Sequence, residues 1–157
     1  MSYLSKALII IFLTFASVAN ASNNNFVGVI GAAIGDIKNQ KNESLSNGSK
    51  IFFGDTIISK SKSNAQILFL DQTVLTLGEE TELTIDEFVY DPNSQDGSFV
   101  STVKTGTVKF ITGQISKKNP DNLEVKVPAG TLGARGTEFV VLSESNNEST
   151  VVLLGPG

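Results

Sequence analysis

Residues 65–89 have the sequence AQILFLDQTVLTLGEETELTIDEFV, in which apolar side chains recur at every second position. Ile67 and Phe69 alternate with their neighbours, and Leu83 and Ile85 do the same further along. A period of two places successive side chains on opposite faces of a strand, whereas an amphipathic helix needs a period of 3.6. This stretch therefore predicts extended strands, with Leu83, Ile85 and Val89 on one face. Residues 65–70 are apolar on both faces toward the end of the run, as expected of a strand that is covered on both sides.

The same pattern continues through the rest of the chain and predicts an all-β domain. Short runs rich in Val, Ile, Thr and Phe, which favour strands, are separated by turn residues at short intervals. The turn residues are Gly48, Gly54, Asp71, Gly78, Asp91, Pro92, Asp96, Gly97, Gly106, Gly113, Gly130 and Gly133. An open sheet leaves unpaired edges, so a closed or coiled arrangement is expected. The pattern itself leaves open both a β-sandwich and a coil of stacked strands.

Residues 1–21 are predicted to be a secretory signal peptide. Lys6 supplies a positive start, residues 7–15 are almost entirely apolar, and residues 19–21 (Ala-Asn-Ala) form a small-residue cleavage site. The apolar run is shorter than the roughly 20 residues of a membrane-spanning helix, although an uncleaved anchor is the alternative. We expect the mature chain, residues 22–157, to be one periplasmic or secreted domain without a transmembrane segment.

Composition excludes several classes of function. The chain has no His and no Cys, which removes His-based triads, Cys nucleophiles, disulfides and the usual zinc and copper ligands. Its 12 Lys and Arg against 16 Asp and Glu give a formal net charge of −4. An acidic chain lacks the basic surface that nucleic acids require. We therefore expect neither a nucleic-acid partner nor a cofactor.

One carboxylate cluster needs to be weighed as a catalytic site. It comprises Glu79, Glu80, Glu82, Asp86 and Glu87. A carboxylate pair can act as acid and base in glycoside cleavage. Glu82 and Asp86, however, alternate with apolar residues, as the solvated face of a strand does. Trp is absent and only two Tyr occur, so an aromatic platform for sugars is missing. We expect the protein not to be an enzyme.

Asp91, Asn93 and Asp96 offer closely spaced oxygen ligands in one loop, which resembles a calcium-binding loop. The register does not fit an EF-hand, because the glycine falls one position late and Thr102 stands where a bidentate Glu belongs. The Pro and the Asp-Gly pair of the loop also suit a hairpin turn, which explains the same residues without a metal.

The chain has a single arginine, Arg135, which lies between Gly133 and Gly136. Glycine permits a positive φ and close backbone approach, so the guanidinium is expected to be fixed at a tight bend. Its planar fork can bond several carbonyl groups or a carboxylate. The carboxylates considered as partners are Asp71, Glu82 and Glu138. A structural arginine that closes a turn and a ligand-binding arginine both remain open.

Several stretches, in order along the chain, resemble the FecR domain, the periplasmic module of bacterial regulators in iron-uptake signalling. They are Gly54–Ile58, Ala65–Asp71, Val74–Gly78, Leu83–Phe88 and Val127–Phe139. The motif residues that we expect to be important are Gly54, Asp55, Asp71, Gly133, Arg135, Gly136, Thr137 and Phe139. Gln72 departs from the pattern, because the family usually has Gly after that Asp. The departure leaves the type of this turn open.

The resemblance implies a twisted, solenoid-like β roll and a role in protein contact. Regulators of the family carry a cytoplasmic anti-sigma segment and a membrane helix before the domain, where this chain has the predicted signal peptide. What carries over is an exported β module that senses or binds a protein partner of the bacterial envelope along exposed strand edges. The alternative is a structural module that caps or anchors a larger secreted or surface protein, because residues 88–92 (Phe-Val-Tyr-Asp-Pro) resemble the turn of FecR-like domains at the start of such proteins. The family normally continues with a further strand, so a natural end and a fragment both remain open for the domain 22–157.

Overall fold

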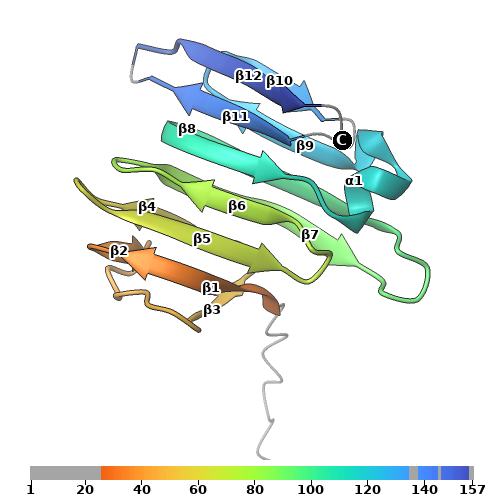
Figure 1. The fold of residues 1–157 in the computed structure, drawn as a ribbon, viewed down its shortest axis with the longest axis horizontal. Helices are drawn as coiled ribbons and strands as arrows, with labels where there is room; N and C mark the ends of the chain where they lie inside the picture. The colour runs from red at the N-terminus through yellow and green to blue at the C-terminus, as the bar shows by residue number, and fades with distance from the viewer. Residues whose placement is uncertain (1–25, 135–137, 145, 156–157) are drawn as a thin grey trace, which may run out of the picture.

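The computed structural model describes residues 26–134, 138–144 and 146–155. Strands account for every long element among these residues, as Figure 1 shows. The helical segments described are α1 (Gln114–Lys118) and the single 3-10 turn η1 (Pro120–Asn122). The predicted all-β fold is confirmed.

The strands follow one another along the chain with short connections. They are β1 (Phe26–Ile34), β2 (Ile37–Asn39), β3 (Lys50–Phe52), β4 (Thr56–Ser59), β5 (Asn64–Phe69), β6 (Val74–Leu77), β7 (Glu82–Tyr90), β8 (Gly97–Ile111), β9 (Leu123–Val127), β10 (Gly130–Gly133), β11 (Glu138–Ser143) and β12 (Ser149–Gly155).

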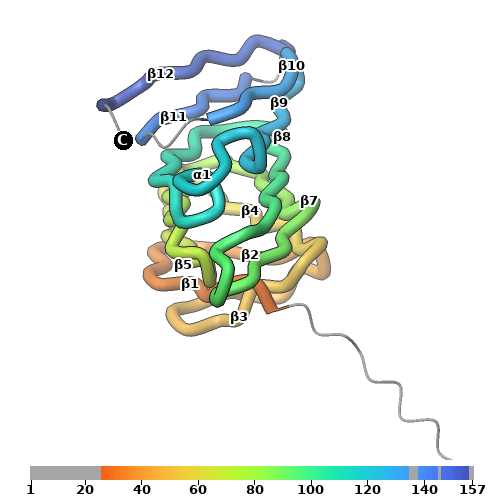
Figure 2. The backbone as a smooth tube through the Cα atoms, turned by 90° about the vertical axis from the view of Figure 1, so that its right-hand side faces the viewer, coloured from red at the N-terminus to blue at the C-terminus, as the bar shows by residue number. Residues whose placement is uncertain are grey.

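The twelve strands belong to one sheet that curls into a roll with two faces. Face 1 contains β3, β1, β5, β6, the second half of β8, β11 and β12. Face 2 contains β2, β4, β7, the first half of β8, β9 and β10. All pairings are antiparallel except that of β8 with β9. Figure 2 shows the two faces as layers, with β1 and β5 on one side and β7 and β9 on the other.

Strand β8 connects the two faces, which makes the sheet a continuous roll. It pairs with β7 as far as Thr105 and with β11 from Gly106 onward. Gly106 has a φ of +90°, and a Cβ atom there would lie 2.3 Å from the Thr81 hydroxyl. A left-handed φ and that lack of space both require glycine. Gly106 therefore determines where the sheet turns from one face to the other.

The space between the faces is filled by apolar side chains. Phe69, Phe88 and Phe99 pack together, with ring centroids 4.7 Å to 5.5 Å apart. Phe110 and Phe139 stack in parallel at 4.8 Å.

The core-side assignment of Ile67, Phe69, Leu83 and Ile85 is confirmed, because all four are buried. Val89, which the sequence placed on the same face as Leu83, is 61% exposed, because the register of β7 against β8 shifts between Ile85 and Glu87. The expectation that the strand at residues 65–70 is covered on both sides is also wrong, since Leu68 and Leu70 are 39% and 49% exposed.

One end of the roll, formed by β2 and β3 and here called the capped end, is covered by the chain itself. The segment 40–49 crosses it and bonds to the neighbouring strands. Leu45 N donates to the Ile37 carbonyl at 2.8 Å, and Ile30 N donates to Ser49 at 2.9 Å. The Leu45 side chain packs against the core. The outer edge of β2 is therefore occupied.

Candidate functional site

Asp71 is fully buried and holds α1 against the turn between β5 and β6. Its Oδ1 accepts a hydrogen bond from Thr73 N at 3.0 Å, and its Oδ2 accepts one from the Thr73 hydroxyl at 2.8 Å. Oδ2 also accepts from Ile115 N at 3.4 Å, and the Asp71 carbonyl accepts from Gln114 N at 2.7 Å. A buried carboxylate needs such donors, and these bonds give Asp71 a structural role.

Gln72 adopts the backbone conformation that glycine favours. Its φ is +70°, and its N–H donates to the Phe69 carbonyl at 3.0 Å. Its side-chain oxygen accepts a bond from Gln114 Nε2 at 3.2 Å, which adds a contact with α1. The turn after Asp71, whose type the sequence left open, therefore contains a residue in the left-handed conformation. That conformation costs roughly 1 kcal/mol of conformational free energy for a residue with a Cβ.

Gly54 and Asp55 form the turn between β3 and β4. Gly54 has a φ of +82°, and the Asp55 carboxylate accepts a bond from Phe52 N at 2.9 Å. The backbone of both residues bonds to Ile85 on β7, each at 2.9 Å. The pair thus ties the turn to face 2, and these contacts are structural.

The glycine-rich motif is only partly described. Gly133 ends β10 and is exposed, whereas Phe139 on β11 is 2% exposed and stacks on Phe110. Arg135, Gly136 and Thr137 lie outside the described residues, so the predicted bend and the role of the arginine stay predictions. Phe139 is a core residue of face 1.

Three further carboxylates have partners on neighbouring strands, namely Glu82, Asp86 and Glu138. Glu82 pairs with Lys104 at 3.0 Å, and Asp86 accepts a bond from the Thr102 hydroxyl at 2.6 Å. Glu138 forms an ion pair with Lys109. Glu82 and Asp86 alternate with the buried residues of β7, as their sequence pattern predicted.

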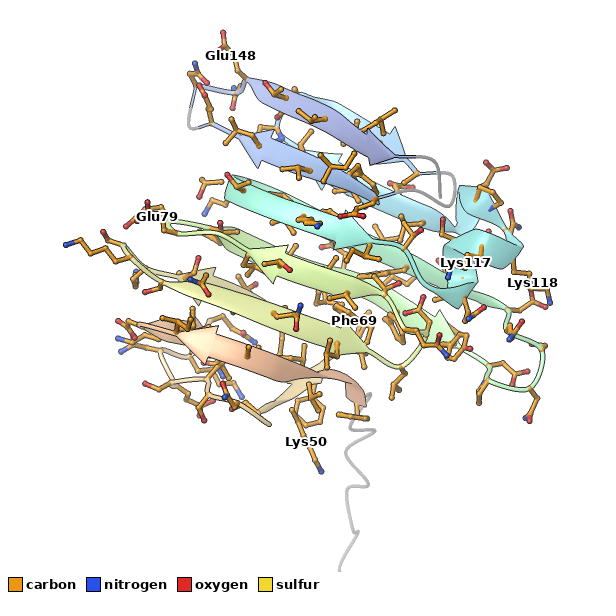
Figure 3. The ribbon with its side chains drawn as sticks, in the orientation of Figure 1. Lys50, Phe69, Glu79, Lys117, Lys118 and Glu148 are labelled. Atoms are coloured by element: carbon orange, nitrogen blue, oxygen red, sulfur yellow. The ribbon has the colours of Figure 1, made fainter. Side chains whose placement is uncertain are left out.

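The loop between β7 and β8 forms the predicted hairpin turn. The Asp91 carboxylate accepts bonds from Asn93 N at 2.9 Å and from the Ser94 hydroxyl at 2.8 Å. These bonds, that from Asn93 foremost, hold the pKa of Asp91 below its ordinary value. Asp96 pairs with Lys118 of α1 at 2.8 Å, and Lys118 is labelled in Figure 3. Within the described ranges, no three acidic side chains gather as a metal site would require.

The other end of the roll, formed by β10 and β12 and here called the open end, lacks such a cover in the part of the chain that the structure describes. Among the described residues, β12 pairs only with β11, and β10 pairs only with β9. Figures 1 and 2 place both strands at the same end of the molecule. Within the part of the chain that the structure describes, both faces of the roll therefore end there in a strand with an unpaired edge.

Strand β12 exposes apolar side chains on both of its sides. Leu153 lies opposite the buried Phe139, and Val151 lies opposite the buried Val141. Opposite residues of an antiparallel pair point to the same face, so Leu153 and Val151 are on the core side of the sheet. Leu153 is nevertheless 69% exposed and Val151 is 38% exposed. The core is therefore uncovered beside β12.

The edge of β12 also lacks the usual protection against pairing with other chains. Natural edges are short, charged or covered. At the capped end, β2 and β3 have three residues each, and they contain Lys38 and Lys50. In contrast, β12 has seven residues, none charged. In the sequence, residues 151–154 are a short apolar run without charge. That run is a signal of an unprotected edge, but the sequence does not give its register against β11.

Among the described residues, the longest helix has five residues, and none is long and apolar enough to cross a bilayer. Comparison with protein families finds that residues 55–155 match the model described as FecR protein. The matched region extends from the β3–β4 turn to the end of β12. Comparison with curated proteins and with solved structures finds no match.

Proposed function

The chain belongs to the FecR protein family, and on that premise we propose that it is a non-catalytic, exported module that acts by binding another protein. The predicted signal peptide, residues 1–21, supports export to the periplasm or beyond. Protein binding is supported above all by one observation, the unpaired and uncharged edge of β12.

The edge of β12 suits the addition of a strand from a partner. An unpaired edge offers a row of backbone N–H and C=O groups, and an added strand would bond to them. The partner's apolar side chains would cover Leu153 and Val151, which the sheet directs toward the core. Burial of such surface contributes about 25 cal/mol for each Å² removed from water.

A non-catalytic role is supported by how the acidic residues are engaged. Asp71 bonds to Thr73 and α1, and Glu82 pairs with Lys104. Such bonds fix the turn and the strands in which they occur. With no His and no Cys, the chain also lacks the commonest nucleophiles and bases.

A second candidate function is that of a structural module within a larger exported assembly. It is favoured by the position of β10 and β12 at the same end of the roll, because a neighbouring unit could continue both faces there. The partner would then be a fixed neighbour, and the contact would be permanent.

Site-specific photo-crosslinking in the native envelope tests the proposal. A crosslinker at Val152, on the exposed edge strand, should link the mature chain to a specific protein. The matched control is Thr76 on β6, which lies between β5 and β8 on the same face. The mature chain should begin at Ser22 and fractionate outside the cytoplasm. A retained N-terminus, or equal labelling from both positions, would contradict the proposal.

A further inference from the structure

The open end presents two edges at once, and this restricts what can cover it. A single added strand on β12 would leave β10 unpaired on the other face. A partner that covers both must offer two edge strands, separated by the distance between the two faces of this roll. The open end of a second copy meets that requirement by construction.

We propose that the open end is a self-association surface, at which a second copy of this chain binds through a twofold axis that passes between the two molecules. The axis is perpendicular to both faces, so that β12 pairs antiparallel with its counterpart and the two β10 edges meet. The inference rests on the proposed function, because it assigns a partner to the same surface.

The sequence of β12 is suited to pairing with itself. An antiparallel register centred on Val152 places Val151 opposite Leu153 of the second copy, and Val152 opposite its own counterpart. Residues directly opposite one another share a face, so the core-side residues of both molecules lie on the same side. Leu153 and Val151 of each copy would then cover the uncovered core of the other.

Charge does not oppose this contact, although the chain is acidic. Its formal net charge of −4 would cause two copies to repel one another at most surfaces. Neither β12 nor β10 contains a charged residue. Glu138, which lies opposite Gly155 on the neighbouring strand, is paired with Lys109. The open end is thus a surface where like charges do not face each other.

The oligomeric state of the mature chain, measured by sedimentation equilibrium, tests the inference. The wild type should have twice the monomer mass. Leu153→Lys should raise the dimer Kd at least about 100-fold, because it brings two like charges into the contact. The control is Ile34→Lys, which replaces a comparably exposed residue (62%) on β1 and should leave the Kd unchanged. Circular dichroism would establish that both variants are folded.

A disulfide tests the register. The chain has no Cys, so Val152→Cys introduces a single thiol that would lie opposite its own copy. Oxidation should link Val152→Cys into dimers at least about tenfold faster than Thr76→Cys, because paired Cβ atoms on adjacent strands approach disulfide distance. Equal rates would overturn the proposed pairing.

The outcomes separate the two proposals. A monomeric wild type that still crosslinks to a different envelope protein at Val152 would overturn self-association and leave the proposed function standing. A dimer unaffected by Leu153→Lys would place self-association elsewhere and refute this inference. A monomer without any crosslinked protein would contradict both.

Discussion

The two ends of the roll differ in how their edges are treated. At the capped end, the edge strands β2 and β3 have three residues each and contain lysines, and segment 40–49 bonds along β2. At the open end, β12 has seven residues, no charge and a Leu on the core side that is 69% exposed. The same sheet thus carries one end that is protected against added strands and one that is not.

The difference shows where this fold is available for binding. Burying an edge within the chain satisfies its backbone groups and prevents pairing with other molecules. An edge left bare over seven residues retains that capacity. The function proposed above follows from this asymmetry, since a module closed at both ends would offer no strand to a partner.

The largest expected effect is a difference in unfolding free energy between variants of β11 and β12, which shows whether the core ends between these two strands. Phe139→Ala should lower the free energy of unfolding by about 3–5 kcal/mol, because it removes a buried ring that stacks on Phe110. Leu153→Ala, at the position directly opposite, should cost less than about 0.5 kcal/mol in the monomer. Urea denaturation of both variants at low protein concentration measures the contrast. Equal losses would mean that the core extends beneath β12.

A smaller effect on stability should show that the cover at the capped end acts independently of binding at β12. Leu45→Lys should lower the free energy of unfolding by roughly 1–2 kcal/mol, because the side chain that covers the capped end packs against the core. The adjacent exposed residue supplies the control, Ser46→Lys, which should be nearly neutral. Neither change should alter the contact made by β12. If Leu45→Lys abolished partner binding, the two ends would not be independent.

The smallest effect concerns the turn between β5 and β6, beside α1. Gln72→Gly should raise the free energy of unfolding by roughly 0.5–1 kcal/mol, because glycine removes the cost of a φ of +70°. The gain is reduced by the loss of the bond from Gln114. Thermal unfolding measures it, and partner binding should stay as in the wild type. A destabilised variant would show that the bond from Gln114 outweighs the backbone strain.

The candidate site was predicted only in part. The resemblance drew attention to Gly54, Asp55 and Asp71. The structure places Gly54 and Asp55 at the turn from face 1 to face 2, and Asp71 at the turn between β5 and β6 on face 1. The residues that distinguish the open end, Val151 and Leu153, belonged to an apolar run with no assigned role. Their importance depends on an exposure that only the neighbouring strands define.

Local pattern by itself determined the strand character of this chain and the core side of Ile67, Leu83 and Ile85, because alternation is a property of successive residues. It did not indicate α1, whose five residues are too few for a helical period. The contact of Asp71 with Ile115, 44 residues away, and the position of Leu153 opposite Phe139 were decided by tertiary structure. The physical reason is that register and edge exposure depend on which strands become neighbours, and the curl of the sheet brings together segments that are distant in sequence.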